Sequence, residues 1–130
     1  MRNLIIIASA VVVGWIAISS VSCKSDYVLP EPIILPDTVS FQLDIIPIFE
    51  SGCISSGCHG QGAIPPNLTR ANAYTSLTDG GYINLSTPEL SELYLWMRGE
   101  GGRAPMPISG TIEANNAKVL KWIQEGAKNN

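Results

Sequence analysis

The sequence predicts an all-α fold for the part of the chain that follows residue 40. Several segments there have apolar residues, caps and breakers that indicate regular structure. In each of them the apolar residues recur at helical spacing. Glycine and proline residues separate these segments and mark the turns between them. The four expected helices cover residues 45–51, 70–77, 88–98 and 113–125. A chain of 130 residues is long enough for one small domain.

The first expected helix, 45–51, is short and begins close to a proline. Asp44 is its expected cap, and Pro47 falls in the first turn, where a missing N–H costs little. The apolar side of this helix consists of Ile45, Ile48 and Phe49. This helix leads the chain directly into a segment that contains two cysteines.

The remaining helices have clear start or stop signals. Thr69 is the expected cap of helix 70–77, which Asp79-Gly80-Gly81 ends. Helix 88–98 begins with proline at its first position, which is a favourable place for that residue. The expected apolar residues are Leu90, Leu93, Tyr94 and Met97 in helix 88–98, and Val119, Leu120 and Ile123, with Trp122 alongside, in helix 113–125.

The first 22 residues have the composition of an export signal. Arg2 gives a short positive region, residues 4–18 are almost wholly apolar, and small residues precede Cys23. Cleavage before Cys23 would leave this cysteine first in the mature chain, which resembles a bacterial lipoprotein signal. We therefore expect a lipidated Cys23 on the periplasmic face of a membrane or on the cell surface. Ordinary secretion with an incidental cysteine, or an uncleaved anchor, are the alternatives.

Residues 23–39 are expected to form a tether between the lipid and the domain. Pro30, Pro32 and Pro36 favour an extended backbone, and the segment has neither helical nor strand periodicity. The apolar residues Ile33, Ile34 and Leu35 leave a second possibility open, in which the segment lies on the domain. The domain itself is expected to cover residues 40–130.

The stretch Cys53-Ile54-Ser55-Ser56-Gly57-Cys58-His59-Gly60 contains two of the three cysteines and the only histidine. Two thiols followed at once by an imidazole are what covalent haem attachment requires. The thiols add to the two vinyl groups of the porphyrin, and the adjacent histidine becomes an axial ligand of the iron. Four residues separate the cysteines here, whereas two is the usual number. A disulfide and a zinc site are the competing explanations, but a zinc site lacks an obvious fourth ligand.

The sole histidine limits the choice of a second axial ligand. Met97 and Met106 are the two methionines beyond the initiator. Met106 lies between Pro105 and Pro107, which disfavour a helix and stiffen the loop from which the thioether projects. Met97 belongs to an expected helix as one of its apolar residues. We therefore expect Met106 to be the ligand, with packing as the alternative explanation of either methionine.

Two further interactions are expected around a haem. The ligating imidazole usually donates its other N–H to a backbone carbonyl, and the carbonyls of residues 64–66 are the candidates. Arg98 and Arg103 are the basic residues nearest to the Met106 loop, and either could pair with a haem propionate. A solvated surface charge is the alternative for each arginine.

The charge of the chain narrows the classes of partner. Eight basic and eleven acidic residues give a formal charge of −3 with no basic tract, which argues against a nucleic-acid partner. Loss of Arg2 on cleavage leaves seven basic and eleven acidic residues, a charge of −4. From this negative charge we expect a redox partner with a basic docking patch.

The order of these features resembles a known family. The residues are Phe41, Asp44, Ile45, Pro47, Ile48 and Phe49, then Cys58-His59-Gly60, Leu93-Tyr94, Met106-Pro107, Trp122-Ile123 and Gly126-Ala127. Together they resemble the small class I-like cytochrome c domains of exported bacterial proteins, which are often lipoproteins of Bacteroidetes-type organisms. The resemblance covers residues 40–128 and departs from the usual pattern in the four-residue gap between the cysteines.

The resemblance implies an all-helical fold around one covalent haem c. Cys53 and Cys58 would form the thioethers, His59 would be the proximal ligand and Met106 the distal one. The expected function is one-electron transfer to transient redox partner proteins, without catalysis. Two alternatives remain: a haem-based ligand-binding or sensor domain, and a disulfide-linked lipoprotein interaction module without a cofactor.

Overall fold

The computed structural model describes residues 31–130, and the expected signal peptide and Cys23 lie outside the described residues. The described part is helical and contains no strand, so the predicted all-α class is confirmed. In chain order the elements are η1 (Phe41–Ile45), α2 (Ile46–Gly52), α3 (Ala73–Asp79), η2 (Pro88–Leu90), α4 (Glu92–Arg98) and α5 (Glu113–Gln124). No helix of this part is long and apolar enough to cross a membrane.

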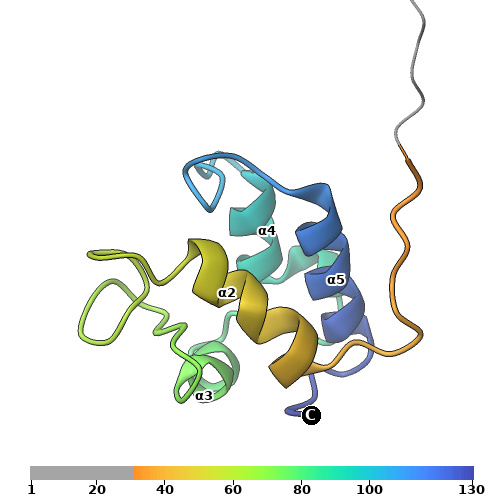
Figure 1. Cartoon of the computed structure of the whole chain (residues 1–130), viewed down its shortest axis with the longest axis horizontal. Helices are drawn as coiled ribbons and strands as arrows, with labels where there is room; N and C mark the ends of the chain where they lie inside the picture. Colours follow the sequence, from red (N-terminus) through yellow and green to blue (C-terminus); the bar gives the residue numbers. More distant parts are fainter. Residues whose placement is uncertain (1–30) are drawn as a thin grey trace, which may run out of the picture. The chain divides into compact units, whose positions relative to one another are not determined.

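The longest helix, α5, packs against three other elements. It contacts η1, η2 and α4, so residues from both ends of the domain meet on it (Figure 1). One cluster of buried apolar side chains lies between these elements. Its members are Val39, Phe41, Ile45, Ile46, Ile48, Phe49, Leu68, Ala73, Leu77, Leu93, Tyr94, Met97, Val119, Trp122, Ile123 and Ala127.

The start of the first helical segment differs from the prediction. A π-helical turn, η1, precedes α2, and Ser40 caps it by accepting a hydrogen bond from the N–H of Leu43. Asp44 does not cap α2 as expected. Its carboxylate instead accepts a hydrogen bond from the N–H of Ser40 at 2.9 Å. Pro47 does lie in the first turn of α2, as predicted.

The second predicted helix begins later than expected. Its first residue is Ala73 and its last is Asp79, whereas the prediction was 70–77. Thr69 is not the cap, because its hydroxyl donates to the side chain of Asn67 at 2.7 Å. That bond belongs to a turn which carries the chain from the cysteine loop to the helix. The helix also ends two residues later than expected, because Asp79, the first residue of the predicted breaker, is still helical and only Gly80 ends it.

The third predicted helix is divided into two. Pro88 begins the 3-10 turn η2, and the extended backbone of Ser91 separates it from α4. Ser91 is buried, and its hydroxyl accepts a hydrogen bond from the N–H of Asn84 at 2.9 Å. This contact with the preceding loop replaces the continuous helical turn that the sequence predicted. Of the four residues expected on the apolar side of this helix, Leu93, Tyr94 and Met97 are buried, but Leu90 is exposed.

The last helix agrees with the prediction apart from its final residue, because α5 ends at Gln124 instead of Glu125. Val119 and Ile123 are buried, as expected, while Leu120 is only partly buried. Trp122 was expected to lie beside the inner face, but it is completely buried and its ring packs 5.0 Å from that of Phe41.

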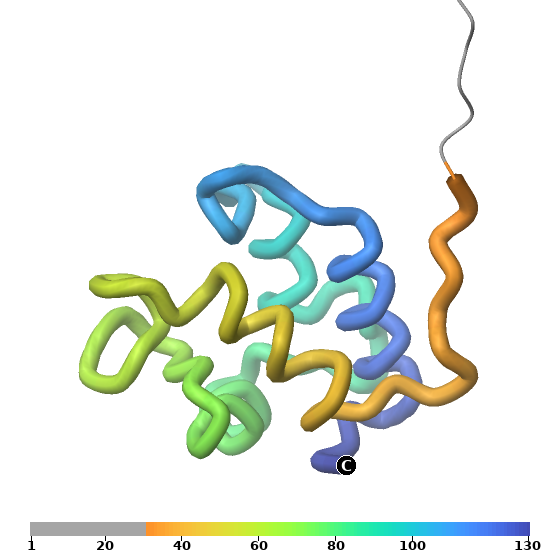
Figure 2. Tube along the Cα trace, viewed as in Figure 1, coloured from red at the N-terminus to blue at the C-terminus, as the bar shows by residue number. Residues whose placement is uncertain are grey.

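The end of the expected tether contacts the domain. Figure 2 shows residues 32–39 passing along α5 before the chain enters η1. The ammonium group of Lys121 donates to the carbonyl of Pro36 at 2.7 Å, and Val39 is buried in the core. Ile33 and Ile34 are exposed. The described part of the segment therefore has an exposed beginning and an end that lies on the domain.

Candidate functional site

The cysteine loop begins where α2 ends and is closed by backbone hydrogen bonds. Cys53 follows the last residue of α2, and its N–H still donates to the carbonyl of Phe49 at 2.8 Å. The carbonyl of Cys53 then accepts from the N–H of His59 at 2.9 Å. Gly57 has a φ of +81° inside this loop, a conformation that favours glycine. The four residues between the cysteines thus form a tight, closed loop.

The imidazole of His59 has a fixed partner. Its Nδ1 atom lies 3.1 Å from the carbonyl oxygen of Ile64, which confirms the expected interaction with the 64–66 segment. A carbonyl can only accept, so the proton of this bond must be on Nδ1. In the neutral imidazole the other ring nitrogen, Nε2, then carries the lone pair through which histidine binds a metal. The N–H of Ile64 donates to the carbonyl of Cys58 at 3.0 Å, which holds the acceptor in place.

The loop that carries Met106 is attached to the end of α4. The N–H of Met106 donates to the carbonyl of Trp96 at 2.9 Å. Helix α4 ends at Gly99, which has a left-handed conformation with a φ of +70°. A Cβ atom at this position would lie 3.1 Å from the ring of Pro105, so glycine allows the loop to pass close to the helix end. The methionine is therefore positioned by the chain, as its flanking prolines predicted.

A single apolar cavity brings the predicted site residues together. Its volume is about 260 Å³, and Cys53, His59 and Met106 all lie on its wall. Cys58, one residue before His59, is half-buried but does not line the cavity. The other lining residues are Phe49, Ile64, Pro65, Pro66, Leu68, Tyr82, Leu93, Trp96 and Met97. An imidazole and a thioether therefore share one pocket, although 47 positions separate residues 59 and 106 in the chain.

Most of the cavity wall was not predicted from the sequence. Tyr82, Trp96 and the Pro65-Pro66 pair come from different segments, and no spacing rule connects them with the cysteine loop. Met97 also lines the cavity, so position in the cavity wall does not distinguish it from Met106 as the expected ligand. It differs from Met106 in lying on a helix and in being buried among core residues.

The two arginines near the Met106 loop both pair with carboxylates of the chain. Arg103 makes a two-pronged ion pair with Glu92, with the closest N–O distance at 2.7 Å, and lies over the ring of Trp96. Arg98 bonds to Glu100 at 2.6 Å and to the hydroxyl of Tyr94. Tyr94, followed by Glu100, raises the pKa of Arg98. A haem propionate would have to compete with these partners, which favours the alternative of ordinary surface charges.

Cys53 and Cys58 are free thiols in the structure, so no disulfide joins them. Burial raises the pKa of the Cys53 thiol to about 11, and the neighbouring Cys58 adds to the rise. Cys53 is therefore a neutral thiol at pH 7, whereas thiol–disulfide enzymes use a thiolate. Among residues 31–130 there is no group of three or more His, Cys, Asp or Glu side chains arranged to hold a metal ion.

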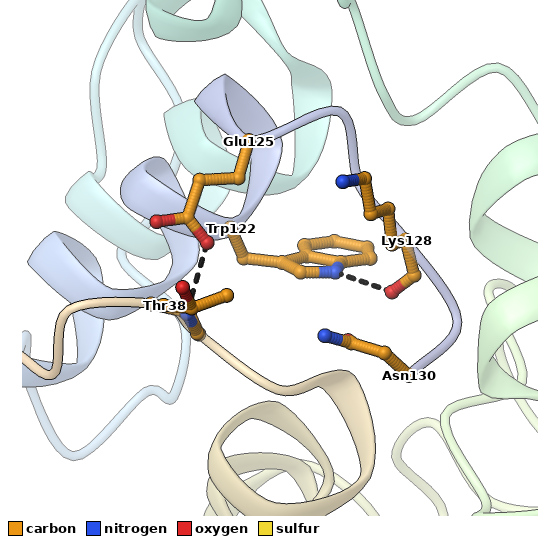
Figure 3. A pocket seen from close by; sticks show the side chains of 6 residues that line it. Thr38, Trp122, Glu125, Lys128 and Asn130 are labelled. Atoms are coloured by element: carbon orange, nitrogen blue, oxygen red, sulfur yellow. Dashed lines mark hydrogen bonds between the residues drawn. The ribbon is translucent and has the colours of Figure 1, made fainter.

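A second surface cavity, of about 240 Å³, lies where residues 38–39 meet the end of the chain (Figure 3). The indole N–H of Trp122 donates to the carbonyl of Lys128 at 2.9 Å. The carboxylate of Glu125 accepts from the N–H of Val39, also at 2.9 Å. The bond between Val39 and Glu125 joins the two ends of the described domain, and none of the predicted haem-site residues lines this cavity.

Three comparisons with known proteins found no similar protein. No family model, no curated protein and no solved structure matches this chain. The functional argument therefore rests on the residues and their geometry.

Proposed function

We propose that the protein is a monohaem c-type cytochrome that carries single electrons. The observation that carries this proposal is the shared cavity: His59 and Met106, the two expected axial ligands, line the same apolar pocket as Cys53. An imidazole and a thioether are the donor pair of electron-transferring c-type haems. The closed cysteine loop, with both thiols free, supports covalent attachment through Cys53 and Cys58.

The residues present fit a haem in their chemistry. The wall of the cavity is almost entirely aliphatic, aromatic and proline, which suits a porphyrin ring. Its volume of about 260 Å³ is slightly below the roughly 300–1,000 Å³ typical of small-molecule sites. A porphyrin ring would therefore project partly beyond a cavity of this volume. This agrees with a carrier, because electrons must leave through an exposed edge.

Each site residue has a definite task in this function. When bound, the haem supplies an iron that changes between ferric and ferrous states. His59 is oriented by the carbonyl of Ile64, and Met106 is held by its hydrogen bond to Trp96. The apolar wall excludes water, and a thioether ligand favours the reduced state over harder ligand sets. These residues would hold the iron in a fixed position, so that little rearrangement would accompany a change of its oxidation state.

The setting of the carrier follows from the remaining sequence features. We propose that Cys23 carries a lipid and that residues 24–35 hold the domain near a membrane surface after export. The partners would be redox proteins that dock briefly through small interfaces. The mature charge of −4 favours partners with a basic patch. We expect no catalytic activity, because no base–nucleophile pair is evident in the sequence.

The decisive experiment combines mass and visible spectra of the protein made in a haem-attaching host. We expect a covalent haem adduct on the peptide that contains Cys53 and Cys58, and a six-coordinate spectrum in both oxidation states. Substitution of either cysteine by serine should leave a single thioether. Ser55→Ala, an exposed position in the same loop, is the matched control and should keep both. A colourless native protein, or unchanged haem binding after His59→Ala, would overturn the proposal.

The runner-up is a haem-based ligand sensor, in which Met106 leaves the iron readily. The half-buried position of Met106 on a loop is the observation that favours it. Carbon monoxide distinguishes the two functions. An electron carrier should bind the gas slowly in the reduced state, whereas a sensor should bind it at once.

A further inference from the structure

The side chain of Asn116 presents an unusual buried donor. Asn116 lies in the first half of α5 and is only 2% exposed. No acceptor among residues 31–130 lies within hydrogen-bonding distance of its Nδ2 atom. Leaving a buried donor unpaired destabilises a fold, and such groups therefore call for an explanation. Ser91, the other buried polar residue of the described part, has its hydrogen-bond partner.

Asn116 lines a smaller cavity that shares part of its wall with the proposed haem pocket. This cavity has a volume of about 120 Å³. Cys53, Met97 and Met106 line both this cavity and the larger one. Met106 therefore borders the proposed haem pocket and also the smaller cavity that Asn116 lines. This position was not predicted from the sequence.

The wall of this smaller cavity offers hydrogen-bond acceptors near Asn116. The thioether sulfur of Met106 is a weak acceptor and keeps a free lone pair even when another is given to a metal. The hydroxyl of Ser51, also on this wall, donates to the carbonyl of Ile48 at 3.0 Å and keeps lone pairs that can accept from the same water. A water molecule occupies about 30 Å³ of liquid volume, so the cavity has room for a bridging water.

We propose that Asn116 is a positioning residue for Met106, whose thioether sulfur accepts a hydrogen bond from one water molecule that the Asn116 amide holds. This inference rests on the proposed function. The bond would hold the sulfur against displacement from the iron. It would also withdraw electron density from the sulfur, which weakens its donation to ferric iron more than to ferrous iron. Asn116 would thereby raise the reduction potential.

Asn116→Leu tests the inference, because leucine has a similar size and no donor. In the haem-loaded protein we expect added imidazole to displace Met106 from ferric iron about tenfold faster. That factor corresponds to about 1.4 kcal/mol, within the range of one net hydrogen bond. The reduction potential should fall, and the sulfur-to-iron charge-transfer band should shift. Gln124→Leu, which removes an exposed amide from the same helix, should change none of these.

Asn116→Asp provides a second variant should leucine prevent folding. It keeps the shape but replaces the amide donor with an acceptor, so displacement should again become faster. Unchanged displacement and potential in whichever variant folds would overturn the inference. A wild-type protein that carries haem without the methionine band would also overturn it, while leaving covalent attachment intact. A wild-type protein without haem would overturn the proposed function, and this inference with it.

Discussion

His59 is the only histidine of the chain, so a second imidazole from the same chain cannot complete a haem site. The orientation of this residue depends on one carbonyl, that of Ile64, at 3.1 Å. Two methionines line the cavity, and they differ in setting: Met106 is on a loop and Met97 is buried on α4. Single substitutions at these positions therefore separate ligation from packing.

Met106→Ala should convert the haem protein to a five-coordinate form, because the proposed sixth ligand is removed. Carbon monoxide should then bind the reduced protein at least tenfold faster, and the potential should fall. Met97→Leu is the matched control. It conserves volume, so it should cost less than about 1.5 kcal/mol in unfolding free energy and keep the six-coordinate spectrum. The reverse pattern in stopped-flow and visible spectra would assign the ligand to Met97.

At the scale of elements, turns and caps decide where the site residues lie. Gly99 ends α4 in a left-handed conformation and lets Pro105 pass close by, so it indirectly positions Met106. Ser40 caps η1, and its hydroxyl donates to the carbonyl of Asn130 at 2.8 Å, which joins the two ends of the domain. These two residues affect the fold in distinguishable ways.

Gly99→Ala should destabilise the protein and disturb methionine ligation. Alanine at a φ of +70° is strained by about 1–3 kcal/mol, and its Cβ would press on Pro105 at 3.1 Å. Gly102→Ala is the matched control, since Gly102 has a φ of +80° but no atom within 4 Å of the added Cβ. It should lower stability through strain alone and leave the sulfur-to-iron band unchanged. Equal effects of the two variants on that band would contradict this account.

Ser40→Ala should lower the free energy of unfolding by about 1 kcal/mol, the usual cost of losing a helix cap. Urea unfolding followed by circular dichroism measures this change. Because η1 lies apart from the cavity wall, the visible spectrum should stay the same. Ser86→Ala, in an exposed loop, should alter the urea midpoint little. A cap substitution without any loss of stability would show that the Ser40 bonds contribute nothing net.

At the scale of the whole molecule, the domain is small and the proposed haem pocket borders its core. A folded part of about 90 residues buries a limited share of its surface. The cavity wall includes Phe49, Leu68 and Leu93, which also belong to the core. A bound haem would therefore enlarge the core that stabilises the fold.

The protein made without haem attachment should be poorly folded. We expect a weakened helical signal and loss of a cooperative thermal transition, because the apolar cavity then faces water. Far-UV circular dichroism and calorimetry of the two forms measure the difference. An apoprotein that melts cooperatively at the temperature of the haem-loaded form would contradict this prediction.

Local signals determined the helical class in advance and placed the C-terminal helix ends within two residues of where they lie. Glycine at residues 80 and 99 and proline at residue 47 act through their own backbone restrictions, so their effects are evident from the sequence. Caps were less predictable. Asp44 and Thr69 each found another hydrogen-bond partner, since a short polar side chain has several backbone groups within reach.

The sequence by itself determined the all-α class and the chemical identity of the candidate ligands, because helix periodicity, sole residues and proline-flanked loops are local properties. Only the tertiary structure decided that His59 and Met106 share one cavity, that Arg98 and Arg103 already have carboxylate partners, and that Asn116 is buried without an acceptor. These facts depend on contacts between segments distant in the chain. Such contacts arise from the packing of the whole core, which no local pattern encodes.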